Sequence, residues 1–468
     1  MLLILFLINF LCIITVIFSD NKKPQETLAW ILLLYIFPIG GVLVYILFGN
    51  PFPAYKKKKL SLREYCHFKD YIELNKKDIL KDKKNISKNS KDLILFNFKN
   101  NLSIFSKDNT LTLFTDGYDK YKSLFSDILN AKYSINIEYY IIRNDKVGND
   151  FVSLLTKKAK EGVKVNLLYD EFASAKTSLK MFKPLIDAGG NVHRFFNSMG
   201  INLIKVNNRN HRKIAVIDGK TGYIGGMNIG LEYMGLKRLT PWRDTHLKIE
   251  GSAVYSLQAR FLNDLVLCTK NFKIDYKFYF PKVDFLGDKS VQIITSDPEC
   301  RKEEIKYSFI KMINMAKKSI YIQTPYFVPD SAFLEALKIA ALSGVDIRIM
   351  IPGKPDKKYI YYINMSYIDE LIKYGVKFYI LDAFLHSKTI VTDCEITSIG
   401  TSNFDIRSFT LNYEINAFIY DKEFAIKNVD AFLQDIKNSK LLTYEEFKKR
   451  STFKKLCEKT LKLFSPLA

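Results

Sequence analysis

Residues 211–230 read HRKIAVIDGKTGYIGGMNIG, and residues 386–405 read HSKTIVTDCEITSIGTSNFD. Both stretches begin with the pattern H-x-K-x4-D, and in both a Gly and then an Asn follow it. Each of these positions in the second stretch lies 175 residues after its counterpart in the first. The chain has only five histidines, so two of them opening the same pattern by chance is improbable. The paired motif therefore predicts an internal duplication in which each half carries the same chemical groups.

The spacing within each motif predicts a strand followed by a hairpin turn. Side chains two positions apart on a strand share a face, so His211 and Lys213 should face one pocket. Residues 218–221 read as the turn, and Asp218 is suited to bracing it, a structural role that is commoner there than a chemical one. The return strand should bring Asn228 back toward the histidine. The catalytic candidates are His211, Lys213, Asp218, His386, Lys388 and Asp393, and the phosphate-binding candidates are Asn228 and Asn403.

Two such half-sites facing each other would suit chemistry at a single phosphate group. Two ammonium groups and two amides can surround the phosphate oxygens with positive charge and hydrogen-bond donors. An imidazole near its reference pKa of about 6.5 can act as a neutral nucleophile or as a protonated acid. A covalent phosphohistidine would divide one displacement into two. Because lysines can neutralise the oxygens and the sequence shows no ligand cluster, we expect no metal and no cofactor.

The similarity between the halves extends beyond the motifs. AKYSINIEYYIIRND at 131–145 resembles AKKSIYIQTPYFVPD at 316–330, and each precedes a helical segment. Further pairs of similar strand segments begin at Gly162 and Gly344, and at Asn191 and Gly375. Strands that alternate with helices predict an α/β fold with a mainly parallel sheet flanked by helices. We expect two similar domains packed as a pseudo-dimer.

The N-terminus carries two uncharged apolar runs, Leu2–Phe18 and Leu28–Phe48. A run of about 20 residues can cross a hydrocarbon core of about 30 Å, so the sequence predicts a transmembrane hairpin over residues 1–50. Pro38 and two glycines interrupt the second run, and a re-entrant hairpin that does not fully cross stays open. A signal peptide fits less well, because the first run lacks a basic flank and a small-residue cleavage site.

Basic residues follow the second apolar run, at Lys56–Lys59 and Arg63. Lys and Arg near membrane segments favour the cytoplasmic side, so both termini and the catalytic region are expected in the cytoplasm. The formal charge of the whole chain is +22, which favours anionic partners such as phospholipid or nucleic acid. Frequent use of lysine along the whole chain explains that charge about equally well. Six scattered cysteines without a CxxC pair indicate neither a disulfide framework nor a zinc site.

These patterns divide the chain into five predicted parts. They are a transmembrane hairpin at 1–50, a basic polar linker at 51–95, a first domain at 96–283, a second domain at 284–440 and a basic amphipathic segment at 441–468. In the last segment, Phe447, Phe453, Leu456, Leu461 and Phe464 alternate with basic residues. Either a helix lying on anionic lipid or a solvated helix packed on the core would explain this pattern.

At these residues the sequence resembles the phospholipase D superfamily, and more narrowly its bacterial cardiolipin synthases. The resemblance covers nearly the whole chain. It includes PQETLAWILLLYIFPIGGVLVYILFG in the N-terminal region, RNHRK at 209, WRDTH at 242, TPYFVPD at 324, GTSNFDIRS at 400, LNYE at 411 and LFSPL at 463. It implies two phospholipase D-type domains with a mixed sheet.

The resemblance also implies a role for each candidate residue. His211 would attack phosphorus and His386 would serve the leaving group. Lys213, Lys388, Asn228 and Asn403 would bind the phosphoryl oxygens. An acidic residue downstream of each motif orients its histidine in the family, and the matching positions are Asp244 and Glu414.

The implied reaction joins two phosphatidylglycerols into cardiolipin and releases glycerol at the bacterial cell membrane. The expected partners are phosphatidylglycerol and anionic membrane lipid, without nucleic acid, and the oligomeric state is left open. A phospholipase D that transfers the same group to water would use the same residues. A nuclease with the duplicated motif would fit the charge, but it has no need of a membrane anchor. A catalytically silent membrane scaffold would not need two complete motifs.

Overall fold

The computed structural model describes residues 2–18, 24–49, 87–195, 207–236, 241–269, 272–299, 302–463 and 465. Several features singled out in the sequence lie outside these residues. They are the basic flank at Lys56–Lys59 and Arg63, Cys66, Phe464, and most of the predicted polar linker.

The two halves of the chain share one sheet of sixteen strands, and each half repeats the same strand order. The first half runs β1 (Phe105–Phe114), β9 (His246–Glu250), β7 (Thr221–Gly225), β6 (Lys213–Ile217), β2 (Ser134–Tyr139), β3 (Lys164–Asp170) and β4 (Asn191–Phe195). The second half runs β10 (Lys289–Ser296), β19 (Asn412–Ile419), β17 (Ile396–Gly400), β16 (Thr389–Thr392), β11 (Ser319–Gln323), β13 (Asp346–Pro352) and β14 (Lys377–Leu381), with β20 (Ser439–Leu442) added at the edge. The predicted duplication is confirmed.

The sheet is mixed, so the expectation of a mainly parallel sheet was wrong. Within each half, the parallel pairs are those among β2, β3 and β4 and among their counterparts β11, β13 and β14. The motif strands pair antiparallel, because each motif folds as the hairpin of β6 with β7 or of β16 with β17. A tight hairpin can only connect antiparallel strands, whereas the parallel strands need the helical crossovers found earlier in each half.

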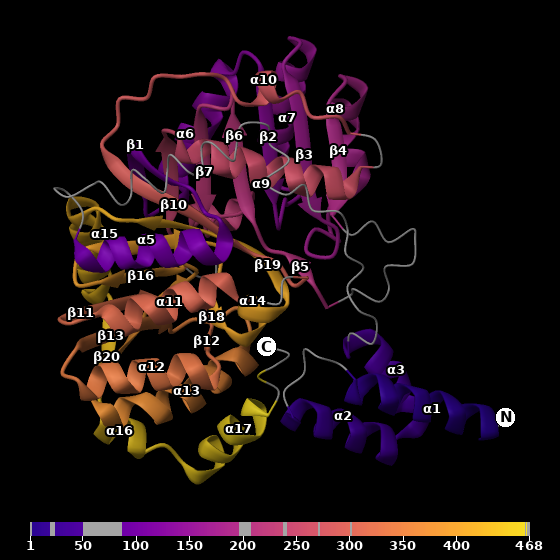
Figure 1. Ribbon diagram of the computed structural model, residues 1–468, viewed down its shortest axis with the longest axis vertical. Coiled ribbons are helices and arrows are strands. Elements are labelled where there is room, and N and C mark those ends of the chain that lie inside the picture. The colour runs from indigo at the N-terminus through magenta and orange to yellow at the C-terminus, as the bar shows by residue number, and fades with distance from the viewer. Residues whose placement is uncertain are drawn as a thin grey trace.

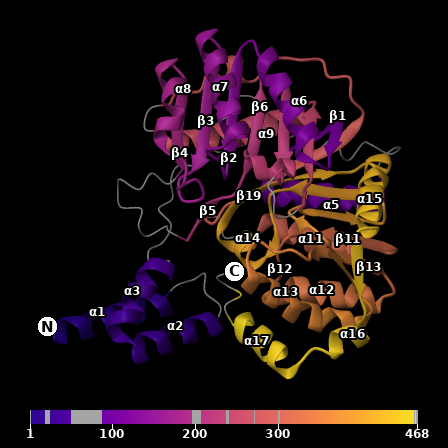
Figure 2. The ribbon, with the colours of Figure 1, turned by 180° about the vertical axis from the view of Figure 1, so that it is seen from behind.

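Helices cover both faces of the sheet, as Figures 1 and 2 show. Around the first half these are α6 (Gly117–Asn130), α7 (Lys146–Lys160), α8 (Lys183–Asp187), α9 (Ala253–Cys268) and α10 (Tyr276–Tyr279). Around the second half they are α11 (Glu304–Met315), α12 (Ser331–Leu342), α13 (Lys358–Leu371), α14 (Ile406–Thr410) and α15 (Lys422–Ile436). On β2, Ile135 and Ile137 join the core under α6 and α7, while Asn136 between them bonds Gln258 of α9 at 3.1 Å. This alternation follows from the two-residue period of a strand.

Among the described residues, three strand pairings join the halves. Strands β1 and β10 pair antiparallel along the centre of the sheet. The short strand β5 (Arg209–Asn210) pairs in parallel with β19 of the second half. The short strand β8 (Trp242–Arg243) pairs in parallel with β15 (Phe384–Leu385) of the second half. The last two contacts matter most for the site, because each ends at a motif histidine.

The helix α5 (Lys88–Asn101) precedes the first half in sequence but packs on the second. Its Leu93 and Ile94 belong to the hydrophobic core of the second half. Its Asn97 donates to the hydroxyl of Tyr420 at 3.1 Å. Residues 88–95, which the sequence assigned to a polar linker, are therefore a packed helix, since its apolar residues recur at a helical period. The domain limits given above remain predictions.

The N-terminal region contains three helices, α1 (Leu2–Ile17), α2 (Pro24–Ile36) and α3 (Pro38–Phe48), where the sequence predicted two. The second apolar run breaks at Phe37, because Pro38 has no backbone N–H to continue a helix and fits the first turn of a new one. Within the described ranges, no helix is both long enough and apolar enough to cross a bilayer. The three helices pack on one another through Val16, Leu34 and Tyr45 and form a separate group in Figure 1.

The C-terminal segment folds as α16 (Tyr444–Lys448) and α17 (Thr452–Lys462). Phe447 is buried in the core of the second half, and Lys462 of α17 forms an ion pair with Glu370 of α13. Phe453 and Leu456 point away from this contact and are 74% and 62% exposed. The segment is thus packed on the core along one side and apolar toward solvent along another.

Asp218 and Asp393 tie each motif hairpin to a neighbouring strand. The Asp218 carboxylate accepts hydrogen bonds from the backbone N–H groups of Lys132, Tyr133 and Ser134 at 2.7–2.9 Å. Asp393 accepts the equivalent three from Lys317, Lys318 and Ser319 at 2.7–3.0 Å. Both aspartates have φ of +53°, a left-handed conformation that Asp and Asn tolerate better than other side chains.

We expect Asp218→Asn to lower the free energy of unfolding by about 1–3 kcal/mol, because hydrogen bonds to a charged acceptor are worth about that much. Asn accepts the same backbone angle, so the change tests the carboxylate alone. Urea denaturation followed by circular dichroism would measure it. Asp150→Asn, at an exposed position on α7, is the matched control and should leave the midpoint unchanged. Equal midpoints for the two variants would contradict the role given to Asp218.

Candidate active site

His211 lies directly after β5 and is hydrogen-bonded to a carboxylate of the other half. Its Nδ1 lies 3.0 Å from both carboxylate oxygens of Glu414, which is in β19. The backbone explains the match: β5 pairs with Asn412 and Tyr413, and the N–H of His211 donates to the carbonyl of Tyr413 at 3.0 Å. The pairing register therefore places His211 beside Glu414.

His386 lies directly after β15 and mirrors this arrangement. Its Nδ1 lies 2.6 Å from Oδ2 of Asp244, which follows β8 in the first half. Here the N–H of His386 donates to the carbonyl of Arg243 at 2.7 Å. The second Asp244 oxygen accepts from the N–H of Thr245 at 2.7 Å, which fixes the carboxylate.

The structure places each predicted orienting acid beside a motif histidine, but not beside the histidine that the sequence assigned to it. Each acid follows one motif in the chain, which suggested that it serves the histidine of that motif. In the structure each acid serves the histidine of the opposite half. The reason is that β5 and β8 leave their own half and add to strands of the other one.

The two motif lysines point into the same region and are almost completely buried. Lys213 Nζ donates to the carbonyl oxygen of His211 at 2.6 Å. Lys388 Nζ makes the equivalent bond to the carbonyl oxygen of His386. Burial lowers the pKa of Lys388 to about 8, although Asp244 and Glu414 raise it. Burial also lowers the pKa of Lys213, as does its proximity to Lys388.

Both histidines are held neutral near neutral pH. Burial lowers the pKa of His211 to about 4; the Glu414 carboxylate opposes this shift, and Lys213 and Lys388 add to it. Burial likewise lowers the pKa of His386 to about 4, helped by Lys388 and Lys213 and opposed by Asp244. Each histidine thus responds to the lysines of both halves, which shows that the two half-sites form one electrostatic unit.

The carboxylate of Glu414 stays ionised in this unit. Its burial alone would raise its pKa, but His211, Lys213 and the hydroxyl of Thr401 outweigh burial and lower the pKa to about 2. A carboxylate that accepts from Nδ1 fixes the imidazole tautomer and leaves Nε2 for chemistry.

The asparagines are close to the motifs but already bonded. The amide nitrogen of Asn228 donates to the hydroxyl of Tyr233 at 2.8 Å, and its oxygen accepts from the N–H of Ile141 at 3.1 Å. Asn403 is hydrogen-bonded to Asp405, whose pKa is raised to about 6 chiefly by burial. The Asn228 amide is thus bonded at both ends, whereas the side-chain oxygen of Asn403 is buried without a hydrogen-bond partner.

Asp218 and Asp393 do not join the histidines. Arg212 and the five residues of β6 separate His211 from Asp218, and seven steps of about 3.3 Å per residue put the two roughly 23 Å apart. Asp393 stands at the corresponding far end of β16. Their carboxylates accept hydrogen bonds from backbone N–H groups at the turn, which is the bracing role that the sequence favoured for Asp218, and their place among the catalytic candidates stays a prediction.

Aromatic rings enclose both histidines, and the sequence gave no signal for them. The ring of Tyr140 lies 4.8 Å from that of His211, centroid to centroid. The ring of Trp242 lies 5.3 Å from that of His386, and that of Tyr233 lies 6.1 Å away. These rings exclude water, which strengthens electrostatic interactions at the site.

Arg212 is a second feature that sequence reasoning missed. It sits between His211 and Lys213 but points to the opposite face, where it is fully buried. It forms ion pairs with Asp264 and with Asp297, which comes from the second half. Its Nε donates to the backbone oxygen of Glu414 at 3.3 Å, so this network fixes the strand that carries the orienting acid.

Across the ranges that the structure describes, no group of three or more His, Cys, Asp or Glu side chains is arranged to hold a metal ion. The expectation of a reaction without metal or cofactor stays a prediction.

Known families and proteins resemble this chain over most of its length. The family described as "Cardiolipin synthase, PLD-like domain" matches residues 124–240 and 309–436, and "Phospholipase_D-nuclease N-terminal" matches residues 7–50. The major cardiolipin synthase ClsA of Bacillus subtilis is 43% identical over 99% of this chain and 98% of its own length. The cardiolipin synthase of Listeria monocytogenes serotype 4a is also 43% identical, over 100% of this chain and 98% of its own length.

Solved structures show the same fold at low sequence identity. The phosphatidylserine synthase of Haemophilus influenzae superposes with a TM-score of 0.59 at 16% identity, covering 76% of this chain and 92% of that protein. The match extends over both halves of the sheet, in agreement with the duplicated strand order. The chain belongs to the cardiolipin synthase family of the phospholipase D superfamily.

Proposed function

We propose that this protein is a cardiolipin synthase, which transfers a phosphatidyl group from one phosphatidylglycerol to another and releases glycerol. The observation that carries the proposal is the crosswise pair of buried imidazoles, each held through Nδ1 by a carboxylate of the other half, with two lysines beside them. This arrangement supplies a nucleophile, an acid/base and two cations around one phosphate. The full-length similarity to proteins named cardiolipin synthase supports the choice of acceptor.

In the first step, Nε2 of His211 attacks the phosphorus of the first lipid. The bond from phosphorus to the glycerol oxygen breaks, and His386 donates a proton to that oxygen as glycerol leaves. The neutral state of His211 is what this step needs. His386 must carry a proton, and the negative phosphodiester favours that, because a nearby opposite charge raises the pKa of an imidazole.

In the second step, the terminal hydroxyl of a second phosphatidylglycerol gives its proton to His386 and attacks the same phosphorus. The bond from phosphorus to His211 breaks, and cardiolipin is released. One phosphodiester replaces another, so no activated nucleotide is consumed. Lys213 and Lys388 stabilise the extra charge on the phosphoryl oxygens in both transition states.

The purified protein in detergent should convert phosphatidylglycerol into cardiolipin and free glycerol, in equal amounts, with a chelator present. His211→Ala and His386→Ala should each lower the rate by at least about a thousandfold, since both steps need both imidazoles. Thin-layer chromatography of the lipids and an enzymatic glycerol assay would measure the products.

His193→Ala, on β4 and away from the motifs, is the control and should keep full activity. Phosphatidic acid as the sole lipid product would favour a hydrolase instead. Cleavage of single-stranded DNA without lipid turnover would favour a nuclease. Full activity in either motif variant would remove that histidine from the mechanism.

The pH dependence of kcat, at saturating phosphatidylglycerol, should show two limbs, because the bound phosphodiester keeps His386 protonated between them. The rate should fall as pH drops through about 4, where His211 becomes protonated and loses its nucleophilic form. It should also fall as pH rises through about 8, where Lys388 loses its charge. Lys388→Arg should move the alkaline limb to higher pH, because a guanidinium stays charged there. If the limb stays at about pH 8 in this variant, a group other than Lys388 causes it.

We also propose that the N-terminal helices anchor the protein in the bacterial membrane, with the catalytic halves on the cytoplasmic side. Large apolar side chains are exposed along α1–α3, among them Phe10, Phe18, Tyr35, Phe37 and Ile39. Exposed apolar surface of this extent is typical of contact with lipid or a partner. Helix α17, on which Phe453 and Leu456 are exposed, lies at the same end of the molecule as α1–α3 in Figures 1 and 2.

A cysteine tag added after Ala468 should stay unlabelled by a membrane-impermeant thiol reagent in intact cells and react once the cells are opened. The basic residues after the apolar runs predict this orientation. A variant with the four native cysteines at 12, 268, 394 and 457, and those at 66 and 300, changed to serine removes background labelling. Labelling of intact cells would overturn the orientation.

A further inference from the structure

The proposed reaction requires two phosphatidylglycerols, and each carries its own negative phosphodiester. The two motifs provide cations for the phosphate that reacts. The phosphate of the second, acceptor lipid lies only a glycerol unit away from the hydroxyl that attacks. A second cationic position close to His211 would therefore be expected, and guanidinium groups are the side chains best suited to a phosphodiester.

Arg407 is a cation at the site that the proposed mechanism leaves unused. It follows the second motif directly, at the start of α14, and is half-buried. Its counterpart in the first motif is Glu232, which instead forms an ion pair with Arg143 at 3.1 Å. The two half-sites thus carry opposite charges at this position. Such a difference is expected if the half-site with Arg407 also contacts the phosphodiester of the acceptor lipid.

Neutral acceptors hold the Arg407 guanidinium in place. Its Nη1 donates to Oδ1 of Asn207 at 3.0 Å, and its Nη2 donates to the backbone oxygen of Asn207 at 2.6 Å. Among the residues that the structure describes, no ion pair joins Arg407 to a carboxylate. Asn207 lies four residues before His211, so the guanidinium is fixed beside the segment that enters the first motif.

A second guanidinium lies close to the first. Burial lowers the pKa of Arg407, and the charge of Arg209 lowers it further. Both arginines also act on the hydroxyl of Tyr140, whose pKa is raised to about 12 chiefly by burial. Arg209 lies two residues before His211 in the chain, and the Tyr140 ring on which both arginines act lies 4.8 Å from that of His211. Like charges held together in a half-buried place are a feature of functional sites.

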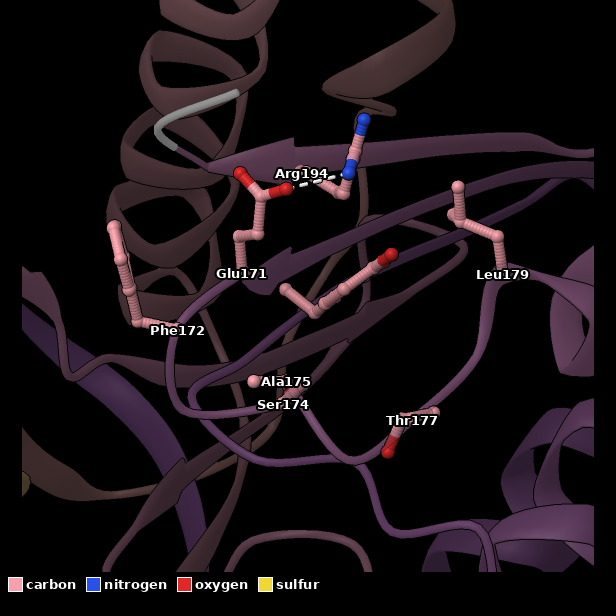
Figure 3. A pocket seen from close by; sticks show the side chains of 8 residues that line it. Glu171, Phe172, Ser174, Ala175, Thr177, Leu179 and Arg194 are labelled. Atoms are coloured by element: carbon pink, nitrogen blue, oxygen red, sulfur yellow. Dashed lines mark hydrogen bonds and ion pairs between the residues drawn. The ribbon is translucent and has the colours of Figure 1, made fainter. Parts of the chain in front are cut away.

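An open cavity of about 310 Å³ lies on the strand ends of the first half and is lined by Phe172, the ring on which Arg209 stacks. The guanidinium of Arg209 lies 4.6 Å from the centre of that ring. Figure 3 shows Phe172 and Leu179 on opposite sides of this space, with the Glu171–Arg194 ion pair at the strand ends. The volume falls in the range of small-molecule sites, which are mostly apolar with a few polar groups.

We propose that Arg209 and Arg407 bind the phosphodiester of the acceptor phosphatidylglycerol, and that the cavity beside Phe172 takes the adjoining glycerol and acyl portion of the same lipid. This inference rests on the proposed function. In the second step the acceptor hydroxyl then stands between these arginines and His386, to which it gives its proton. The bond from phosphorus to His211 breaks as the bond to the acceptor oxygen forms.

A series of three acceptors tests the proposal, with phosphatidylglycerol as the donor throughout. Labelled glycerol carries no charge and yields labelled phosphatidylglycerol by exchange. Glycerol 3-phosphate carries an anion without acyl chains and yields phosphatidylglycerophosphate. A second phosphatidylglycerol carries both and yields cardiolipin. The full-length protein in detergent micelles is used for all three reactions.

Arg407→Ala should lower kcat/KM for the two anionic acceptors by about tenfold to a hundredfold, mainly through KM, as expected for a lost charged hydrogen bond. Glycerol exchange should stay within about twofold of the unsubstituted protein, since the donor step does not need this group. Arg209→Ala should behave in the same way, and Arg407→Lys should recover part of the loss. Arg348→Ala removes an arginine that is paired with Asp346 on β13, and it should leave all three reactions unchanged.

An equal loss for all three acceptors would overturn the proposal. That result, with Asn207→Ala resembling Arg407→Ala, would mean that Arg407 only holds the segment before His211. A different outcome is that inorganic phosphate changes the rate of glycerol exchange in the unsubstituted protein but not in Arg407→Ala. That result would overturn the proposal, because it would show that the arginines bind a free anion rather than the acceptor lipid. Failure of the unsubstituted protein to form cardiolipin, with phosphatidic acid as the product, would contradict the proposed function itself.

Discussion

The site depends on two hydrogen bonds that cross between the halves of the chain, from His211 to Glu414 and from His386 to Asp244. A buried imidazole without its carboxylate would lack a fixed tautomer and any support for a positive charge. Neither half supplies both partners of either pair. The short strands β5 and β8 make the exchange possible, because each pairs with a strand of the opposite half and is followed by a residue of the pair, His211 or Asp244. The active site therefore exists only when the halves are packed together.

Burial sets the chemistry of these groups. The imidazoles and the lysine ammonium groups lie in a pocket walled by aromatic rings, where a charge is costly unless it is paired. Both histidines are consequently neutral, and Lys388 keeps its charge only up to about pH 8. A substrate phosphodiester brings the negative charge that the pocket lacks. Binding of that anion would then favour the protonated form of one imidazole, so the substrate helps to prepare its own acid.

The duplication copies the geometry of the half-site but not all of its residues. The position between the motif His and Lys is Arg212 in the first half, where it joins a buried ionic network with Asp264 and Asp297. It is Ser387 in the second half, where its hydroxyl bonds Thr245 at 2.6 Å. Such differences let a nearly symmetric fold treat two substrates differently. One histidine can form the covalent bond while the other manages protons, although both are oriented in the same way.

The sequence by itself determined the duplication and the motif strands, and it singled out the histidines, lysines and two acids that the structure brings together. These features are local or repeated, so spacing along the chain is enough to reveal them. Three others were decided only by tertiary structure. The acids exchange partners because β5 and β8 cross between halves, Asp218 and Asp393 face backbone N–H groups at the distant turn, and α5 packs on the second half. Each of these is a contact between residues far apart in the chain, which local sequence patterns do not reveal. Such contacts depend on which strand edges and apolar faces remain exposed until the sheet assembles.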